Sequence, residues 1–303
     1  MSIKSMTGDP DLAMVYVAAF SDSGREKLVE FVDASDPEST KEKKWVIIIS
    51  TQFGCPVACP ICDAGASFEG NLSSEQMFAQ IDHVVALHPR SRLLNVEKFK
   101  VQFARMGEPS LNPFVLDVLS KLPPRYEAKG LIPCIATIAP ASARDWFAQL
   151  LDIRKEFYSG REFQLQLSIN STCDATRDRL MPVPKMSFKE LAEVSERFYD
   201  SGTRKVALNF AVADGIEVDS AKIKNVFDPK HCCIKITPLN PTINSAQNGF
   251  MTAVLPDVPE TARAICEDFA SKGFDVILSI GDTRENEIGS NCGMAVRKFR
   301  SAS

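Results

Sequence analysis

Strand-like and helix-like stretches alternate along the chain from about residue 45 to residue 280. Runs of apolar or alternating residues are typical of strands, and apolar residues at helical spacing follow most of them. This βα rhythm predicts an α/β fold, a partial parallel (β/α)6-type barrel with sites at the C-terminal ends of its strands. The expected strands are residues 46–50, 98–103, 131–138, 163–169, 205–212, 233–237 and 275–280, and the expected helices are residues 73–85, 113–122, 142–151, 187–200 and 258–274.

Residues 1–44 depart from this rhythm. Two apolar runs, 13–20 and 27–34, flank the turn signal SDSG and predict a hairpin. We therefore expect residues 1–44 to form a small β extension packed on the barrel. Residues 45–303 would form the barrel and end in a loop that carries a cysteine.

Composition narrows the classes of function. No apolar run approaches the roughly 20 residues of a membrane span, and the N-terminus lacks the order of a signal peptide. We therefore expect a cytoplasmic protein without a membrane partner. The net charge of −4 is unlike the basic surplus of dedicated nucleic-acid binders, although a local basic groove could hide inside an acidic total.

Three of the nine cysteines stand close together, as Cys55-x3-Cys59-x2-Cys62, directly after the first expected barrel strand. Clustered thiols in a reducing compartment indicate metal binding or catalysis. A structural zinc ion needs four ligands, and no second close cysteine pair supplies the fourth. A 4Fe–4S cluster on three thiolates leaves one iron open for a substrate or cofactor, and we favour this interpretation over zinc or chance.

The cysteine triad resembles the signature of radical S-adenosylmethionine (SAM) enzymes. The resemblance implies that the amino and carboxylate groups of SAM chelate the open iron, and that an electron from the cluster cleaves SAM to a 5′-deoxyadenosyl radical.

Further motifs resemble the RlmN/Cfr RNA methylases, which methylate carbon 2 or carbon 8 of adenine. One motif alone is weak, but several in the family's order make a specific pattern. The matching segments are STQFGCPVACPICDAG (50–65), RMGEPSLN (105–112), LQLSINSTCDATRDRLMPVPK (165–185), VADGIEVDS (212–220), IKITPLNP (234–241) and TRENEIGSNCGMA (283–295).

The resemblance assigns the cofactor residues. Gly107 and Glu108 would hold the amino group of SAM, and Asn240 matches a SAM-binding asparagine. Ser168 and Asn170 match a Ser-x-His pair, with asparagine in place of histidine, and Thr137 adjoins the place of a family serine. Judged without the family, Glu108 could be a solvated loop acid and Asn240 a turn residue.

The resemblance also implies that Cys292 carries the methyl group that is transferred. A loop thiol without function is the alternative for this residue. The family's second catalytic cysteine falls at Ile48 here, so the family mechanism cannot run unchanged. Glu30 falls where the family has a proposed proton acceptor, and a surface acid on an edge strand is its alternative. Either the covalent enzyme–substrate adduct resolves without a thiol, or one of five other cysteines replaces the missing one: Cys134, Cys173, Cys232, Cys233 and Cys266.

From sequence, we therefore expect a radical SAM methyltransferase with a 4Fe–4S cluster and SAM. It would act on an sp2 carbon of a small or compact substrate and take electrons from a donor such as flavodoxin or ferredoxin. Ribosomal RNA is a disfavoured partner, because of the acidic charge and because the family's N-terminal RNA-binding domain has no counterpart here. Three alternatives stay open: an RNA adenine methylase with a trimmed RNA-binding region, a radical SAM enzyme that does not methylate, and a SAM-binding relative without turnover.

Overall fold

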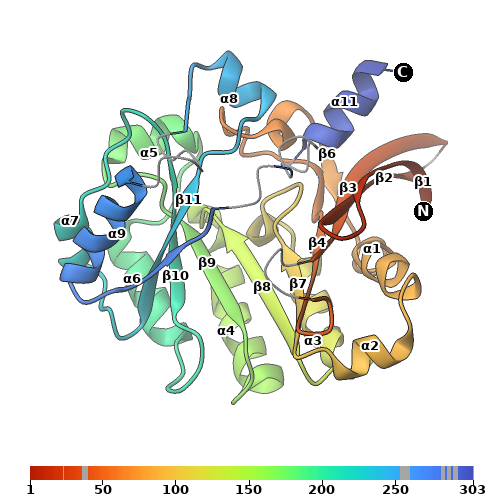
Figure 1. Ribbon diagram of the computed structural model, residues 1–303, viewed down its shortest axis with the longest axis horizontal. Coiled ribbons are helices and arrows are strands. Elements are labelled where there is room, and N and C mark those ends of the chain that lie inside the picture. The colour runs from red at the N-terminus through yellow and green to blue at the C-terminus, as the bar shows by residue number, and fades with distance from the viewer. Residues whose placement is uncertain are drawn as a thin grey trace.

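A curved ten-stranded sheet is the main feature of the computed structural model, which describes residues 1–22, 24–35, 40–252, 260–280, 284, 288 and 293–302. The strand order is β1-β2-β3-β4-β7-β8-β9-β10-β11-β12, and helices follow its outer side (Figure 1). A second sheet pairs β5 (Gln52–Gly54) with β6 (Phe68–Asn71).

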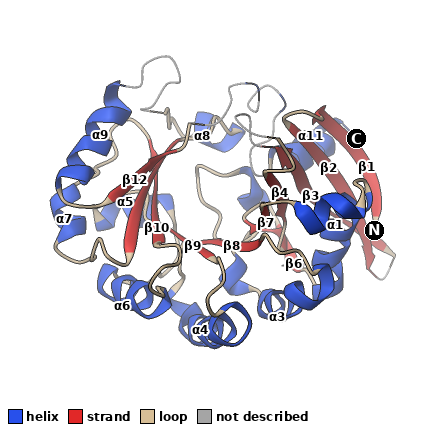
Figure 2. Ribbon diagram, turned by 60° about the horizontal axis from the view of Figure 1, so that its bottom comes forward, coloured by secondary structure: helices blue, strands red, loops and turns tan. Residues whose placement is uncertain are grey.

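Seven consecutive strands of the large sheet run parallel, as the βα rhythm predicts. They curve into an open arc, with α1, α3, α4 and α6 on its outside (Figure 2). The expected partial parallel barrel is thereby confirmed. The parallel strands are β4 (Lys44–Ile49), β7 (Lys98–Phe103), β8 (Leu131–Thr137), β9 (Gln164–Ser168), β10 (Val206–Val212), β11 (Cys232–Pro238) and β12 (Asp275–Leu278).

The helices of the barrel pack against the outer face of the arc. A capping box formed by Ser73 and Gln76 starts the first helix. Some of the helices are short, and the sequence pattern did not predict them. The described helices are α1 (Ser74–Ala86), α2 (Arg90–Asn95), α3 (Phe114–Tyr126), α4 (Arg144–Tyr158), α5 (Asp174–Leu180), α6 (Phe188–Phe198), α7 (Ser220–Lys224), α8 (Ile243–Gln247), α9 (Glu260–Ser271) and α11 (Met294–Ala302).

The N-terminal strands continue the barrel sheet. β2 (Ala13–Asp22) and β3 (Arg25–Ser35) form the expected hairpin, and β3 pairs antiparallel with β4. An additional strand, β1 (Ser2–Asp9), pairs with β2 at the edge of the sheet. Its side chains are mostly exposed, so the apolar pattern of the sequence did not reveal it.

The two faces of the parallel strands differ in polarity. Toward the helices, apolar side chains such as Ile47, Val101 and Phe103 are fully buried and form the main core. Successive side chains of a strand point to opposite faces, so Lys100 and Gln102 face the other way, into the barrel. The core therefore lies outside the arc, and a polar interior remains within it. In the described part of the chain, no helix combines the length and the apolar character that crossing a membrane requires.

Candidate active site

A cavity of about 440 Å³ lies at the C-terminal ends of the parallel strands. We call it the active-site cavity. Residues that the sequence assigned from separate motifs converge on it, as expected for functional groups at this end of a parallel barrel. They are Cys55, Cys59, Cys62, Gly107, Glu108, Thr137, Ser168, Asn170 and Asn240.

The three cysteines lie on a loop that leaves β5. Gly54, just before Cys55, has a φ of +81°, and a Cβ there would lie 1.3 Å from the carbonyl oxygen of Ser67. Only glycine fits this approach. The backbone N–H of Cys62 donates to the carbonyl of Cys59 at 3.1 Å, which closes the loop into a turn. All three cysteine residues are partly exposed and form no disulfide.

The chemistry of these thiols fits an iron–sulfur cluster. Burial, and then the charges of Cys55 and Glu108, raise the pKa of the Cys59 thiol to about 12, so a cationic metal centre is needed to hold it as thiolate. Among the described residues, no three His, Cys, Asp or Glu side chains converge on a single metal ion. A 4Fe–4S cluster does not require such convergence, because each thiolate binds a different iron.

Asp63 anchors the cysteine loop to distant parts of the chain. Its buried carboxylate accepts hydrogen bonds from the backbone N–H groups of Ile243, at 3.0 Å, and Asn244, at 2.9 Å, in α8. It also pairs with Arg297 of α11 at 2.8 Å. The sequence analysis missed this residue, although an acid directly after the last cluster cysteine is visible in the sequence.

Glu108 is buried, with 4% of its surface exposed, which excludes a solvated loop acid. One carboxylate oxygen, Oε1, accepts from the hydroxyl of Ser110 at 2.6 Å and from that of Thr137. The other, Oε2, accepts from the backbone N–H of Ile138 at 3.0 Å. Burial raises the pKa of Glu108, and these hydrogen bonds oppose the rise.

Gly107 and Asn170 adopt backbone conformations that favour their residue types. Gly107 has a φ of +103°, and a Cβ there would come within 2.7 Å of the side chains of Gln52 and Thr51. Asn170 has a φ of +60°, a left-handed conformation that asparagine tolerates better than most residues. Its side-chain oxygen accepts from the N–H of Ala211 at 3.3 Å.

The remaining assigned residues stand where strands end. Ser168 is the last residue of β9, and Asn240 follows β11 and is exposed. Asn209 of β10 also lines the cavity and was not predicted. It is 8% exposed, and its side-chain oxygen has no hydrogen-bond partner among the described residues. This oxygen can accept a hydrogen bond from a donor in the cavity.

Glu30 lies outside the active-site cavity. It is fully buried on β3, an interior strand, which rules out a surface acid on an edge strand. Its carboxylate pairs with Arg105 at 2.8 Å and accepts from the backbone N–H groups of Gly293, at 2.6 Å, and Val296, at 2.8 Å. Glu30 therefore joins β3 to the start of α11.

Cys292 lies outside the described residues. Gly293, bonded to it, is described and packs on the cysteine loop, where a Cβ would lie 2.2 Å from the backbone nitrogen of Ala64. Ile48 pairs with Val32 of β3 and packs among apolar residues. Since Glu30 is two residues from Val32, Ile48 and Glu30 lie on the same face of neighbouring strands.

The other cysteines weighed as replacement thiols occupy different surroundings. Cys232 is buried in the main core, whereas Cys134 and Cys233 line a second cavity inside the barrel. Cys173 and Cys266 are partly exposed, at the start of α5 and within α9. None of the five lines the active-site cavity.

Known proteins resemble the chain at low identity. No protein-family model matches it. A probable dual-specificity RNA methyltransferase RlmN from Frankia casuarinae is 26% identical over 261 residues, which cover 82% of this chain and 57% of that protein. A second protein of that name, from Streptomyces griseus, is 27% identical over 304 residues, covering 94% of this chain and 77% of the relative. The chain thus spans little more than half the length of the Frankia relative.

A solved structure resembles the whole chain. A radical SAM methyltransferase from Sphaerobacter thermophilus superposes with a TM-score of 0.72 at 17% identity, covering 97% of this chain and 80% of that one. The protein therefore has the fold of a radical SAM methyltransferase, and its sequence resembles the RlmN methyltransferases along most of its length.

Proposed function

We propose that the protein is a radical SAM methyltransferase that modifies an sp2 carbon of a small or compact substrate through Cys292. One observation carries the proposal: residues from separate sequence motifs line a single cavity, among them the three cysteines, Glu108 and Asn240. Together they offer thiolates for a 4Fe–4S cluster and polar groups for SAM.

Each group has a part in this proposal. Cys55, Cys59 and Cys62 would hold the cluster, which together with SAM would supply the chemistry for removing a hydrogen atom from an unactivated methyl group. Glu108 would accept from the ammonium of SAM through Oε2, which has one donor among the described residues and therefore retains acceptor capacity. Asn209 adds a buried acceptor to the same wall.

Cys292 would take a methyl group on its sulfur and then pass that carbon to the substrate. An sp2 carbon is a poor nucleophile toward SAM, so a direct displacement is unsuited to it. After loss of a hydrogen atom, that carbon would bond to the substrate carbon and leave a thioether. A base would then remove the proton from the substrate carbon, the carbon–sulfur bond would cleave to leave a methylene that is protonated to methyl, and the cysteine sulfur would take one electron from the electron donor. Glu30 stays our candidate base, and its contacts with Gly293 and Val296 support a second role, as a positioning residue for the Cys292 loop.

The proposal places the enzyme in the cytoplasm, with a flavodoxin or ferredoxin as electron donor. An RNA substrate is the second candidate, because the similar RlmN proteins are named as RNA methyltransferases. The net charge of −4 favours the small substrate.

The mass of the intact protein tests the methyl carrier. Protein expressed with its cluster and SAM should be one methyl group heavier than its sequence, and peptide mapping should place that group on Cys292. The Cys292→Ala variant should lack the extra mass, and the control Cys266→Ala should keep it. An unmodified Cys292 would contradict the proposed methyltransferase activity. Formation of 5′-deoxyadenosine would then favour a radical SAM enzyme that does not methylate. Absence of 5′-deoxyadenosine would favour a SAM-binding relative without turnover.

A further inference from the structure

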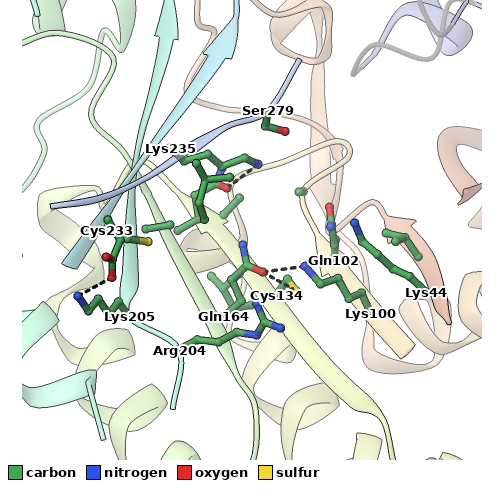
Figure 3. A pocket seen from close by; sticks show the side chains of 18 of the residues that line it. Lys44, Lys100, Gln102, Cys134, Gln164, Arg204, Lys205, Cys233, Lys235 and Ser279 are labelled. Atoms are coloured by element: carbon green, nitrogen blue, oxygen red, sulfur yellow. Dashed lines mark hydrogen bonds and ion pairs between the residues drawn. The ribbon is translucent and has the colours of Figure 1, made fainter. Parts of the chain in front are cut away.

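A second and larger cavity, of about 980 Å³, lies inside the barrel (Figure 3). We call it the basic cavity. Ala104, Ala136, Gln166, Lys235 and Ser279 line both it and the active-site cavity. The two spaces therefore adjoin and share part of their walls.

The inner faces of the strands form the wall of the basic cavity. Lys100 and Gln102 on β7 and Gln164 and Gln166 on β9 alternate with core residues that face the helices. The interior of a closed (β/α) barrel is usually packed with branched apolar side chains. Here the same positions carry long polar side chains, which indicates a hydrated binding space in place of a core.

Positive charge accumulates in this space. Among the described residues that line it, Lys44, Lys100, Arg204, Lys205 and Lys235 are basic, and Asp275 is acidic. The excess of positive charge in the cavity contrasts with the net charge of the chain, which is −4. Such a concentration of one sign in a cavity raises the local concentration of oppositely charged ligands.

The basic side chains of this cavity have two kinds of partner. Lys205 pairs with the carboxylate of Asp275 at 2.7 Å, and Arg204 pairs with that of Glu162. Lys100 instead donates to the amide oxygen of Gln164 at 3.0 Å, and Lys235 to that of Gln166 at 3.2 Å (Figure 3).

The surroundings of Lys100 and Lys235 disfavour their charged forms. Burial lowers the pKa of both, and the positive charges of Arg204 and Lys44 lower that of Lys100 further. The positive charge of Lys100 likewise lowers the pKa of Lys235. A half-buried cation without an anionic partner is costly unless a ligand supplies the charge. An anion between them would offset the burial and the mutual repulsion.

We propose that the basic cavity binds the phosphate-bearing end of a small-molecule substrate whose other end reaches the active-site cavity. The inference rests on the proposed function and adds a substrate class to it. A volume of about 980 Å³ suits a ligand the size of a nucleotide. Several lysine and amide donors around one space match the many acceptor oxygens of a phosphate group. An RNA chain is a poorer fit, because Lys100 and Lys235 face the inside of the barrel.

Inorganic pyrophosphate is the probe for the experiment. Isothermal titration calorimetry on the cluster-loaded protein should show saturable binding of pyrophosphate. Lys100→Gln and Lys235→Gln should each weaken this binding at least about tenfold, which equals ~1.4 kcal/mol. The control Lys155→Gln makes the same charge change at an exposed position on α4 and should bind as the unaltered protein does.

A second readout locates the ligand without relying on variants. Pyrophosphate should protect Lys100 and Lys235 from acetylation by acetic anhydride, followed by peptide mass spectrometry, and should leave Lys155 reactive. No saturable binding, equal binding by the Lys100 and Lys235 variants, or unprotected lysines would overturn the inference. Tighter binding of a dicarboxylate such as succinate, or displacement of pyrophosphate by single-stranded RNA, would overturn the proposal that the ligand is a phosphate-bearing small molecule.

This test is separate from the test of the proposed function. Pyrophosphate binding requires no SAM cleavage, so its failure leaves the assignment of the cluster and of Cys292 standing. Conversely, binding of pyrophosphate by a protein whose Cys292 is not methylated would support the ligand of the basic cavity and contradict the proposed methyltransferase activity.

Discussion

The carboxylate of Glu30 accepts a hydrogen bond from the backbone N–H of Gly293 at 2.6 Å, although 263 positions separate the two residues. The same carboxylate pairs with Arg105 at 2.8 Å, and both side chains are almost fully buried. An acid on the N-terminal extension thereby fixes the residue next to the proposed methyl carrier. The extension is thus an integral support of the site.

The Glu30–Arg105 pair should contribute strongly to stability. Glu30→Ala would leave the guanidinium buried without this partner, which typically costs about 3–5 kcal/mol of unfolding free energy. Glu26→Ala on the same strand removes an exposed pair with Lys4 and should cost under about 1 kcal/mol. Urea denaturation of both variants measures the difference. Equal losses of unfolding free energy would show that the buried pair stabilises the fold no more than the exposed pair does.

Glu30→Gln separates the two roles of this residue, because it keeps an acceptor for Gly293 and removes the base. With the true substrate, a base role predicts a covalent adduct that accumulates on Cys292, since general-base help is typically worth about 10²–10⁴-fold. A positioning role predicts instead no adduct and less methyl group on Cys292 than in the unaltered protein, because the amide nitrogen of glutamine cannot accept from the backbone N–H of Val296. Intact mass distinguishes the two. A variant that turns over like the unaltered enzyme would remove Glu30 from the mechanism.

Removing charge from the basic cavity should stabilise the empty protein. In the folded state burial lowers the pKa of Lys100 and Lys235 below their ordinary 10.5, so the unfolded chain holds more protons between the lowered value and 10.5. The stability of the unliganded protein therefore rises with pH across that window.

The double variant Lys100→Met/Lys235→Met lacks these two groups. It should have the higher melting temperature at neutral pH, and this advantage should shrink as the pH approaches 10.5. The remaining charged or titratable groups near these lysines include Lys44, Arg204 and Cys134, which both proteins share. A variant less stable than the unaltered protein at neutral pH would indicate that the lysines support the fold.

RNA binding gives a further test of the substrate class. Ribosomal RNA fragments should bind no more tightly than nonspecific contacts allow, about 10⁻⁴ to 10⁻⁶ M at physiological salt. Filter binding across a range of salt concentrations measures this affinity. Sequence-specific methylation of such a fragment would establish the RNA methylase in place of the small-molecule enzyme.

Local patterns in the sequence predicted the parallel strands and the cysteine loop. The Ser73–Gln76 capping box and the Cys55-x3-Cys59-x2-Cys62 spacing each depend on residues a few positions apart, and such signals are visible in a single sequence. The strand β1 was missed because its mostly exposed side chains carry no apolar pattern.

Long-range contacts of single polar residues were beyond this kind of prediction. Asp63 contacts Asn244 and Arg297, and Glu30 contacts Gly293, through pairings that only the folded chain creates. The basic cavity could be predicted only in part. The alternation in KFKVQF predicts a strand with lysine and glutamine on one face, but which face points into the barrel depends on the helices that cover the other.

Electron paramagnetic resonance of the reduced protein, with and without SAM, tests the iron–sulfur assignment. We expect the signal of a reduced 4Fe–4S cluster that changes when SAM is added, because SAM would occupy the open iron. Cys59→Ala should abolish that response, and Cys266→Ala should retain it. A colourless protein that carries stoichiometric zinc and gives no signal, or a cluster signal that SAM leaves unchanged, would contradict it.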